Sequence, residues 1–416
     1  VLLGGCVGLA ATIYALAERR AESEAPWFHP LMQTLLLGTT GAFMAGDLFN
    51  LYVWFEILLV ASFGLLATES SLRRPGGALH YVAMNLVSSA LFLLAVGLTY
   101  STARSLNMAD LAPRLRHLAE VSPGLTHAIA GLFLLAFGIK AGLVPLHFWL
   151  PASYHRPSPA VSALFAGLLT KVGLYAMIRV LGPVVPVGPW LARTLLVLAI
   201  ATMIVGVLGA VGQRQVRRVL GFHIVSQIGY MALAVALAWQ GNAAAPAAMV
   251  AALFYIAHHI LVKTNLFLVG GTIRELGGGE DLDRLGGIAR GAPWLMPLFL
   301  VPALSLAGLP PLSGFWAKLS VFRVTLDEGA FVAFAAAAIA GLLTLISMMK
   351  IWMEAFWKPR EEALSPVASG ARFWLLRVGP SAGLALGTLA LGLAPGWLLS
   401  LVNAAARAVV LPGGSP

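Results

Sequence analysis

Long apolar blocks separated by short polar connections run through the whole chain. A stretch of about 20 apolar residues is long enough to cross a bilayer as a helix, which pairs its backbone polar groups internally. The blocks lie at 1–17, 30–46, 47–68, 78–100, 125–150, 158–181, 190–211, 219–239, 247–271, 294–326, 330–352 and 373–402. The pattern predicts an all-α polytopic membrane protein with about 12 transmembrane helices.

Two blocks contain proline near their middle. The fifth reads Lys140-Ala-Gly-Leu-Val-Pro145, and the tenth reads Leu306-Ala-Gly-Leu-Pro310-Pro311. Proline lacks a backbone donor and clashes with the preceding turn, so we expect both helices to be interrupted within the membrane.

The two breaks divide the chain into matching parts. If blocks two to six and seven to eleven are units of five helices, each break falls at the same position in its unit. An odd number of helices makes the units inverted in the membrane, an arrangement known from transporters. We therefore expect an N-terminal block at 1–29, repeats at 30–182 and 190–357, and a C-terminal block and tail at 370–416.

The loops differ in charge according to their place in the order of blocks. Loops after odd-numbered blocks hold most of the loop cations: Arg19, Arg20, Arg73, Arg74, Arg156, Arg214, Arg217, Arg218, Arg274, Arg284, Arg290, Lys358, Arg360 and Arg372. Loops after even-numbered blocks hold little beyond Arg104, Arg114 and Arg116, and here 106–118 predicts a short amphipathic helix at the interface. The positive-inside rule places the odd-numbered loops in the cytoplasm.

Composition excludes other classes of protein. Of 416 residues, 59% are hydrophobic and 11% are charged, whereas soluble domains carry about 25% charged residues. The net charge of +10 would suit nucleic acid, but loop arginines explain it better, so we expect a lipid bilayer and no nucleic acid as partner. The single cysteine, Cys6, excludes a disulfide framework and an iron–sulfur site of the chain's own. Because Val1 already begins an apolar block, we expect the chain to start inside a longer protein.

Ionisable residues inside the blocks are the strongest functional signal. Glu56 lies near the middle of block 47–68, where a charge costs roughly 2.5–3.5 kcal/mol. Of six lysines, four lie well inside blocks: Lys140, Lys171, Lys263 and Lys318. Lysine changes its pKa readily on burial and arginine does not, so this sorting favours sites that lose and regain a proton. Five such groups together would cost on the order of 15 kcal/mol, comparable to the net stability of a domain.

Each buried group has a functional interpretation and a simpler one. Lys140, just before the break at Pro145, where free carbonyls can receive an ammonium, is the natural partner of Glu56; the alternative makes Glu56 a static counter-ion. Lys171 has no local acid and suits a relay, which Lys318 would end after Pro310 and Pro311.

The ninth block carries two adjacent histidines. His259 and Lys263 are four residues apart and share a helix face, so a proton could pass between them directly or through one water. A metal site at His258 and His259 is the alternative, but two histidines without a carboxylate make a poor one. We expect no metal.

Five further residues have both a structural and a functional interpretation. His223, Ser226 and Gln227 could line water or bond across helices. Lys350 suits a side chain that extends to the membrane surface, and Asp47 suits a helix cap better than a cation entry point. Glycine-rich nucleotide motifs with the required context are absent, so we expect no cofactor.

Several segments resemble one known family. Segments 46–59, 140–151, 169–175, 222–230, 258–271 and 306–318 are similar to the proton-translocating antiporter-like membrane subunits. These include subunits of respiratory complex I, of membrane-bound hydrogenases and of Mrp cation/proton antiporters. Segments 46–56, 222–230 and 258–263 are most similar to the D-type subunits of Mrp antiporters.

The resemblance implies a fold and an activity. The fold has fourteen helices in inverted five-helix repeats, of which this chain would hold the third to fourteenth. It implies a Glu56–Lys140 pair, a central axis of Lys171, His259 and Lys263, and a terminal Lys318. The implied function is proton translocation in a sodium/proton antiporter of a prokaryotic inner membrane, beside Mrp A, B, C, E, F and G subunits. The alternative is a non-redox pumping subunit of complex I or a hydrogenase.

Overall fold

The computed structural model describes residues 1–18, 26–67, 76–360, 364 and 370–410, which form helices and loops without a named strand. Four of the loop arginines expected to set orientation, Arg19, Arg20, Arg73 and Arg74, lie outside these residues.

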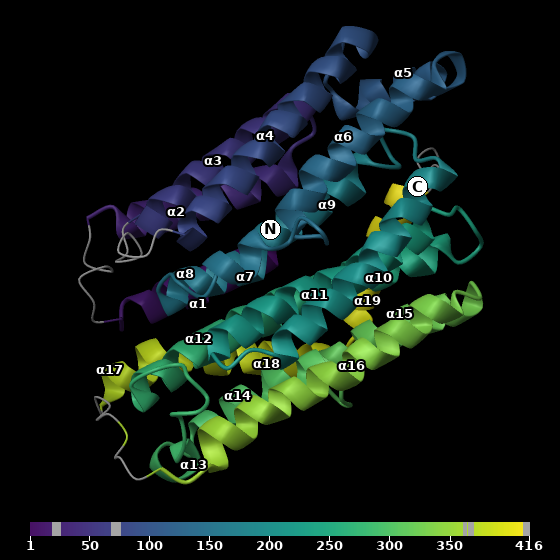
Figure 1. Cartoon of the computed structure of the whole chain (residues 1–416). Helices are drawn as coiled ribbons and strands as arrows, with labels where there is room; N and C mark the ends of the chain where they lie inside the picture. Colours follow the sequence, from purple (N-terminus) through teal and green to yellow (C-terminus); the bar gives the residue numbers. More distant parts are fainter. Residues whose placement is uncertain (19–25, 68–75, 361–363, 365–369, 411–416) are drawn as a thin grey trace.

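The first part of the chain forms one group of helices (Figure 1). Its elements are α1 (Leu2–Ala15), α2 (Phe28–Met44), α3 (Leu48–Ala67), α4 (Gly76–Ala103), α5 (Met108–Val121), α6 (Pro123–Ala141), α7 (Trp149–Ser153), α8 (Pro159–Leu164), the π-helical turn η2 (Phe165–Leu169) and α9 (Thr170–Val180).

The second part packs beside it and contains the longest helix. Its elements are α10 (Pro189–Val211), α11 (Val216–Ala238), α12 (Ala245–Gly277), α13 (Ile288–Gly291), α14 (Leu295–Ala307), α15 (Ser313–Asp327), α16 (Phe331–Ile351), η3 (Trp352–Trp357), α17 (Ala371–Phe373), η4 (Trp374–Val378), α18 (Gly379–Leu393) and α19 (Gly396–Val410).

Membrane-spanning length is common among these helices. Within the described residues, nine helices are long and apolar enough to cross a bilayer, and three shorter apolar helices accompany them. The predicted all-α polytopic class is confirmed. The prediction of a single helix over 373–402 was wrong, because α18 ends at Leu393 and α19 starts after Pro395. Pro395 has no N–H and cannot continue the helical hydrogen bonds.

Both predicted breaks are present. Helix α6 ends at Ala141 and turns through Gly142, whose φ of 81° is in the left-handed region. Helix α14 ends at Ala307 and turns through Gly308, with φ of 94°. Glycine adopts this conformation without a Cβ penalty, so each Ala-Gly-Leu sequence stops its helix just before the prolines. The expected short amphipathic helix is present as α5, and its place at the membrane interface stays a prediction.

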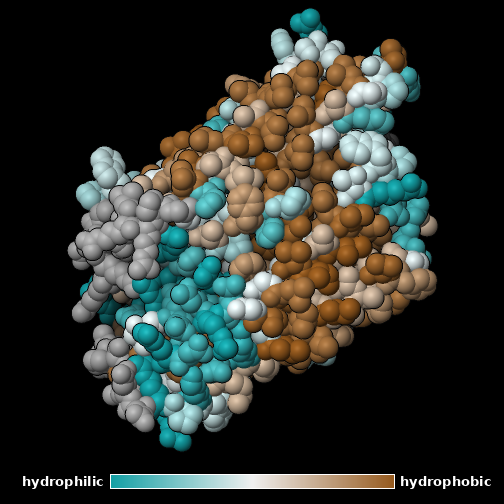
Figure 2. Space-filling model, viewed as in Figure 1, coloured by the Kyte–Doolittle hydropathy of each residue, from teal (hydrophilic) through white to brown (hydrophobic). Residues whose placement is uncertain are grey.

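One end of the molecule gathers the polar loops. Arg214 bonds Asp283 at 3.1 Å across two loops, and Lys358 donates to the Asp283 carbonyl at 2.8 Å. Hydrophilic side chains collect at this end, whereas much of the remaining visible surface is hydrophobic (Figure 2). The loops that follow the seventh, ninth and eleventh blocks therefore meet at one end of the molecule. The side of the membrane that this end faces stays a prediction.

Helix α12 lies at the centre of the second part. It packs against α1, α8, η2, α11, α14, α15, α18 and α19. Its neighbour α11 is buried along nearly all of its length. Polar groups on these two helices therefore face protein rather than lipid.

Candidate functional site

Helix α12 carries three ionisable groups into the interior. His258 is 1% exposed, and His259 and Lys263 are fully buried. The Lys263 ammonium donates to the Leu220 carbonyl of α11 at 3.1 Å. Neither ring nitrogen of His259 has a hydrogen-bond partner within the described part of the chain. An imidazole with two open nitrogens suits a group that accepts and passes a proton.

Lys171 is the second residue of α9, two positions after the π-helical turn η2 ends at Leu169. Its ammonium is fully buried and donates to the Ala166 carbonyl, which lies in that turn. π-helical turns interrupt the regular backbone ladder and are frequent at functional sites. This turn was not predicted from the sequence.

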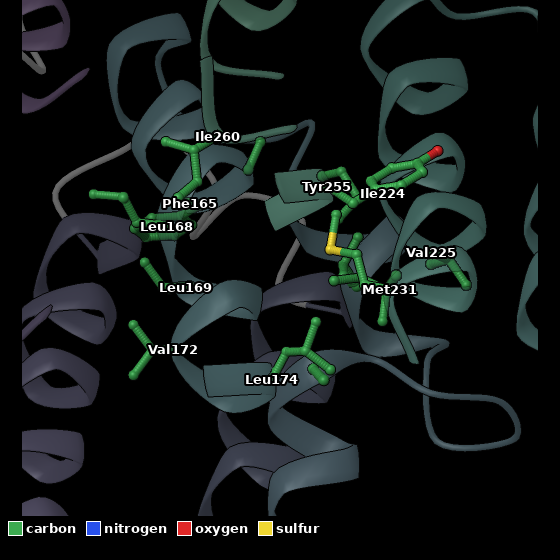
Figure 3. Close-up of a cluster of buried hydrophobic side chains, with 14 of the residues drawn as sticks. Phe165, Leu168, Leu169, Val172, Leu174, Ile224, Val225, Met231, Tyr255 and Ile260 are labelled. Atoms are coloured by element: carbon green, nitrogen blue, oxygen red, sulfur yellow. The ribbon is translucent and has the colours of Figure 1, made fainter. Parts of the chain in front are cut away.

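Apolar side chains surround this region. Phe165 and Leu168 of η2 lie beside Ile260 of α12, and Leu169 and Val172 follow farther along the chain (Figure 3). In such surroundings a charge is poorly screened, so each charge strongly affects its neighbours.

The basic groups of α9, α11, α12 and α15 form one electrostatically linked series. His259 interacts with both Lys171 and Lys263, and Lys171 and Lys263 interact with each other. His223 interacts with Lys263 and Lys318, and His258 interacts with Lys318. The structure therefore brings together six residues from four helices.

Lys318 uses the second helix break. Its ammonium donates to the Ala307 carbonyl at 2.8 Å and lies 5.2 Å from the centre of the Tyr230 ring. In a continuous helix this carbonyl would accept from residue 311, but Pro311 has no N–H. The break thus supplies the acceptor that holds the lysine.

Serines that the sequence pattern did not single out connect the histidines to other helices. His258 Nδ1 lies 2.8 Å from Ser313 Oγ, which is 3.2 Å from Ser305 Oγ across the break. His223 Nε2 lies 2.5 Å from Ser347 Oγ of α16. Hydroxyls both donate and accept, so they can extend a proton path. Their only signal in the sequence was a polar residue within an apolar block.

The first break holds Lys140 differently from the expectation. Its ammonium is 3.4 Å from Ser89 Oγ and 5.7 Å from the centre of the Phe55 ring, rather than on a carbonyl freed by Pro145. Trp149 Nε1 donates to the Ile139 carbonyl at 3.1 Å. The indole thus occupies one acceptor near the break.

Glu56 and Lys140 interact electrostatically without a direct ion pair. Their charges are coupled, but no ion pair of 4.0 Å or less joins them in the described residues, where one Glu56 oxygen is buried without a hydrogen-bond partner. Static counter-ions favour close contact. This looser geometry suits a pair that changes its charge or separation.

The pair and the linked series meet where α9 packs on α6. A Cβ built at Gly173 would lie 2.8 Å from the Lys140 Cβ. Only glycine permits this close approach. Lys171 lies two residues earlier on α9. The Glu56–Lys140 pair and the linked series are therefore two groups on adjacent helices.

Other candidates have structural contacts. Ser226 donates to the Met203 carbonyl of α10 at 3.0 Å, a bond across helices. Lys350 donates to the Val211 and Gln213 carbonyls, each at 2.7 Å, and so caps α10. Asp47 accepts from the backbone of Phe49 and Asn50, which confirms the predicted cap. Groups of three His, Cys, Asp or Glu placed for a metal do not occur in the described residues.

Known proteins share this sequence and architecture. The family described as "NADH:quinone oxidoreductase/Mrp antiporter, TM" matches residues 45–344. The chain is 43% identical to the D subunit of the Na⁺/H⁺ antiporter of Alkalihalophilus pseudofirmus, over 86% of this chain and 71% of that protein. It is 36% identical to the protein of the same name in Bacillus subtilis, covering 99% of this chain and 82% of that one.

Solved structures have the same overall fold as this chain. A chain of the Mrp complex from Dietzia sp. DQ12-45-1b has a TM-score of 0.87 and 34% identity, with 99% of this chain and 83% of that chain covered. A chain of respiratory complex I from Thermus thermophilus has a TM-score of 0.85 and 25% identity, with 100% and 84% covered. The chain belongs to the NADH:quinone oxidoreductase/Mrp antiporter membrane-subunit family and, within it, to the group of Mrp D subunits.

Proposed function

We propose that this chain moves protons across the membrane as part of a multisubunit Na⁺/H⁺ antiporter. The observation that carries the proposal is the electrostatically linked series of buried Lys171, His259 and Lys263. Burying several cations is costly, so their retention favours a role in transport. The two similar antiporter subunits named above support sodium as the exchanged ion.

The proposed route starts at Glu56 and Lys140 and ends at Lys318. A change of charge or distance within the Glu56–Lys140 pair changes the electrostatic energy of an ammonium at Lys171, because Lys140 on α6 and Lys171 on α9 lie in adjacent helices. The proton then passes through His259 and Lys263 toward Lys318, with His223 and His258 beside the path. The breaks at Pro145, Pro310 and Pro311 let Lys140 and Lys318 sit at interrupted backbone.

We place this activity in a particular membrane and beside particular partner subunits. The antiporter lies in the inner membrane of a prokaryotic cell, with the arginine-rich end in the cytoplasm. Subunits of the Mrp A, B, C, E, F and G types accompany the chain. Residues 30–182 and 190–357 act as inverted repeats that rock around the route, with 1–29 and 370–416 outside them. The chain itself catalyses no covalent reaction.

Glu56→Gln in the assembled complex tests the route. The variant removes the charge with little change of volume. We expect antiport in inverted membrane vesicles to fall at least roughly tenfold, because a positioned proton-transfer group typically contributes about 10²–10⁴-fold. Lys140→Ala should have a similar effect. Glu120→Gln removes a carboxylate that is 80% exposed on α5 and should leave antiport unchanged. Full antiport in both Glu56→Gln and Lys140→Ala, with normal assembly, would make the route wrong.

The similarity to complex I favours one other candidate function. In that candidate the chain uses the same charges but takes its energy from electron transfer in partner subunits. Mass spectrometry of the purified complex distinguishes the two. Flavin- and iron–sulfur-containing partners would support the redox complex, and small membrane subunits without them would support the antiporter.

A further inference from the structure

A polar recess of about 420 Å³ lies where the starts of α4 and α11 meet the end of α7. Its side chains are those of His80, His155, Arg156, Gln215 and Arg218, beside Gly77 and Ala152. None of them belongs to the proposed proton route. A Cβ at Gly77 would lie 2.3 Å from the Ala152 carbonyl oxygen, so glycine allows α4 to close this side of the recess.

Among the described residues, the lining has hydrogen-bond donors and positive charge but no carboxylate. Arg156 is held in place by its bond to the Ala152 carbonyl at 3.0 Å. Burial and then the guanidinium groups of Arg218, Arg217 and Arg156 lower the pKa of His155 to about 4. The local field therefore favours an anion.

The position of Arg218 also favours an anion in the recess. Helix α11 begins at Val216 and has no acidic residue in its first turn, where the positive end of the helix dipole disfavours cations. Arg217 is neutralised by Glu280 at 2.6 Å. Arg218 has no such partner in the described residues, and its Nε is buried without a hydrogen-bond acceptor. A buried donor of this kind costs free energy unless an acceptor fills the recess.

The surroundings of the recess indicate a membrane boundary. Leu79 is 67% exposed and Phe148 is 47% exposed, and the Phe148 ring contacts the His80 ring with centroids 6.1 Å apart. Apolar side chains thus lie beside the polar lining, as the acyl chains and headgroup of a lipid require.

We propose that this recess binds a phosphate group, carried by an anionic phospholipid or present as the free ion. The guanidinium groups of Arg156 and Arg218 hold the phosphate oxygens, and the start of α11 adds its dipole. The apolar flank of Leu79 and Phe148 favours the lipid. The bound phosphate accepts from Arg218, whose Nε is buried without a hydrogen-bond acceptor in the described residues.

Native mass spectrometry of the delipidated, assembled complex containing the full-length chain tests the site. Short-chain phosphatidylglycerol is titrated, with phosphatidylcholine as the neutral probe. Arg218→Gln should weaken phosphatidylglycerol binding roughly tenfold, since one charge-assisted hydrogen-bond partner is lost. Arg193→Gln, an equal charge change at an exposed residue of α10, should not. If Arg218→Gln fails to assemble, Arg218→Lys replaces it, because this variant keeps the charge. Its affinity for phosphatidylglycerol should fall several-fold.

Inorganic phosphate, measured by calorimetry in the same variants, separates the two sources. Binding of phosphatidylglycerol but not of inorganic phosphate, dependent on Arg218, supports a lipid site. Arg218-dependent binding of inorganic phosphate supports the ion as occupant. The proposal would be overturned if the parent complex and the Arg218 variants bound phosphatidylglycerol equally well and also bound inorganic phosphate equally well.

Discussion

At the residue scale, backbone carbonyls hold three of the four buried lysines in the described residues, and the Ser89 hydroxyl contacts the fourth, Lys140. Lys171 and Lys318 donate to the carbonyls of Ala166 and Ala307, which lie where the helix is π-helical or broken. Lys263 shares the Leu220 carbonyl of a regular helix. Carbonyl partners solvate an ammonium without a counter-ion, so they leave its charge open to change by neighbouring groups.

The sequence predicted that the lysines in apolar blocks are buried, but not what they contact. Lysine in an apolar block was a clear signal. The contact of Lys140 with Ser89, and that of His258 with Ser313, join residues 51 and 55 positions apart. Such pairs depend on tertiary packing, which periodicity along one helix does not encode.

His155 predicts a pH dependence of stability at the same scale. Its pKa is lowered from 6.5 to about 4, by burial first and then by Arg218, Arg217 and Arg156. The unfolded chain therefore binds a proton that the folded chain does not, and stability falls as pH decreases from about 6.5 to about 4. His155→Gln should lose less stability over this range, measured as the thermal midpoint at each pH. An identical decline in both proteins would contradict this role.

At the element scale, the sequence predicted those helix ends that glycine and proline determine. Both Ala-Gly-Leu-containing breaks were predicted, because the missing proline donor acts locally. The π-helical turns η2, η3 and η4 were not predicted. An extra residue in a turn is set by packing against neighbouring helices and has no fixed sequence signature.

Close packing of α9 on α6 gives a prediction for this scale. Gly173→Ala puts a methyl group 2.8 Å from both Lys140 Cβ and the Ala141 nitrogen, so the helices must separate at a cost of about 1–3 kcal/mol. We expect a lower thermal midpoint and reduced antiport. Gly97→Ala on α4 meets no atom within 4 Å and should change neither measurement. Equal stability of the two variants would argue against the tight contact.

At the scale of the whole molecule, the polar end ties separate parts of the chain together. Buried Arg217 bonds Glu280 at 2.6 Å, the Pro157 carbonyl at 2.5 Å and Ser162 at 3.2 Å. The sequence assigned Arg217 only to a loop that sets orientation. Its burial could not be predicted, because its partners lie 55 to 63 residues away.

This contact predicts a large effect on stability. Arg217→Ala leaves Glu280 poorly paired in a site where its side chain is 12% exposed, so we expect a loss of about 3–5 kcal/mol. Arg214→Ala removes a pair whose side chains are 62% and 60% exposed and should cost at most about 1 kcal/mol. Denaturation of the two variants in the same detergent checks the difference. Similar losses would show that Arg217 adds little to the fold.

The most direct test of the central claim is antiport by the Lys171→Met variant in inverted vesicles, with thermal stability measured alongside. Met keeps the apolar volume and removes a buried cation, so the folded complex should be as stable as the parent or more stable by about 1–4 kcal/mol. Lys358→Met provides the control, since Lys358 pairs with Glu354 and donates to loop carbonyls away from the proposed route. The proposed route predicts loss of antiport in Lys171→Met and its retention in Lys358→Met. Parental antiport in a stable Lys171→Met complex would contradict it.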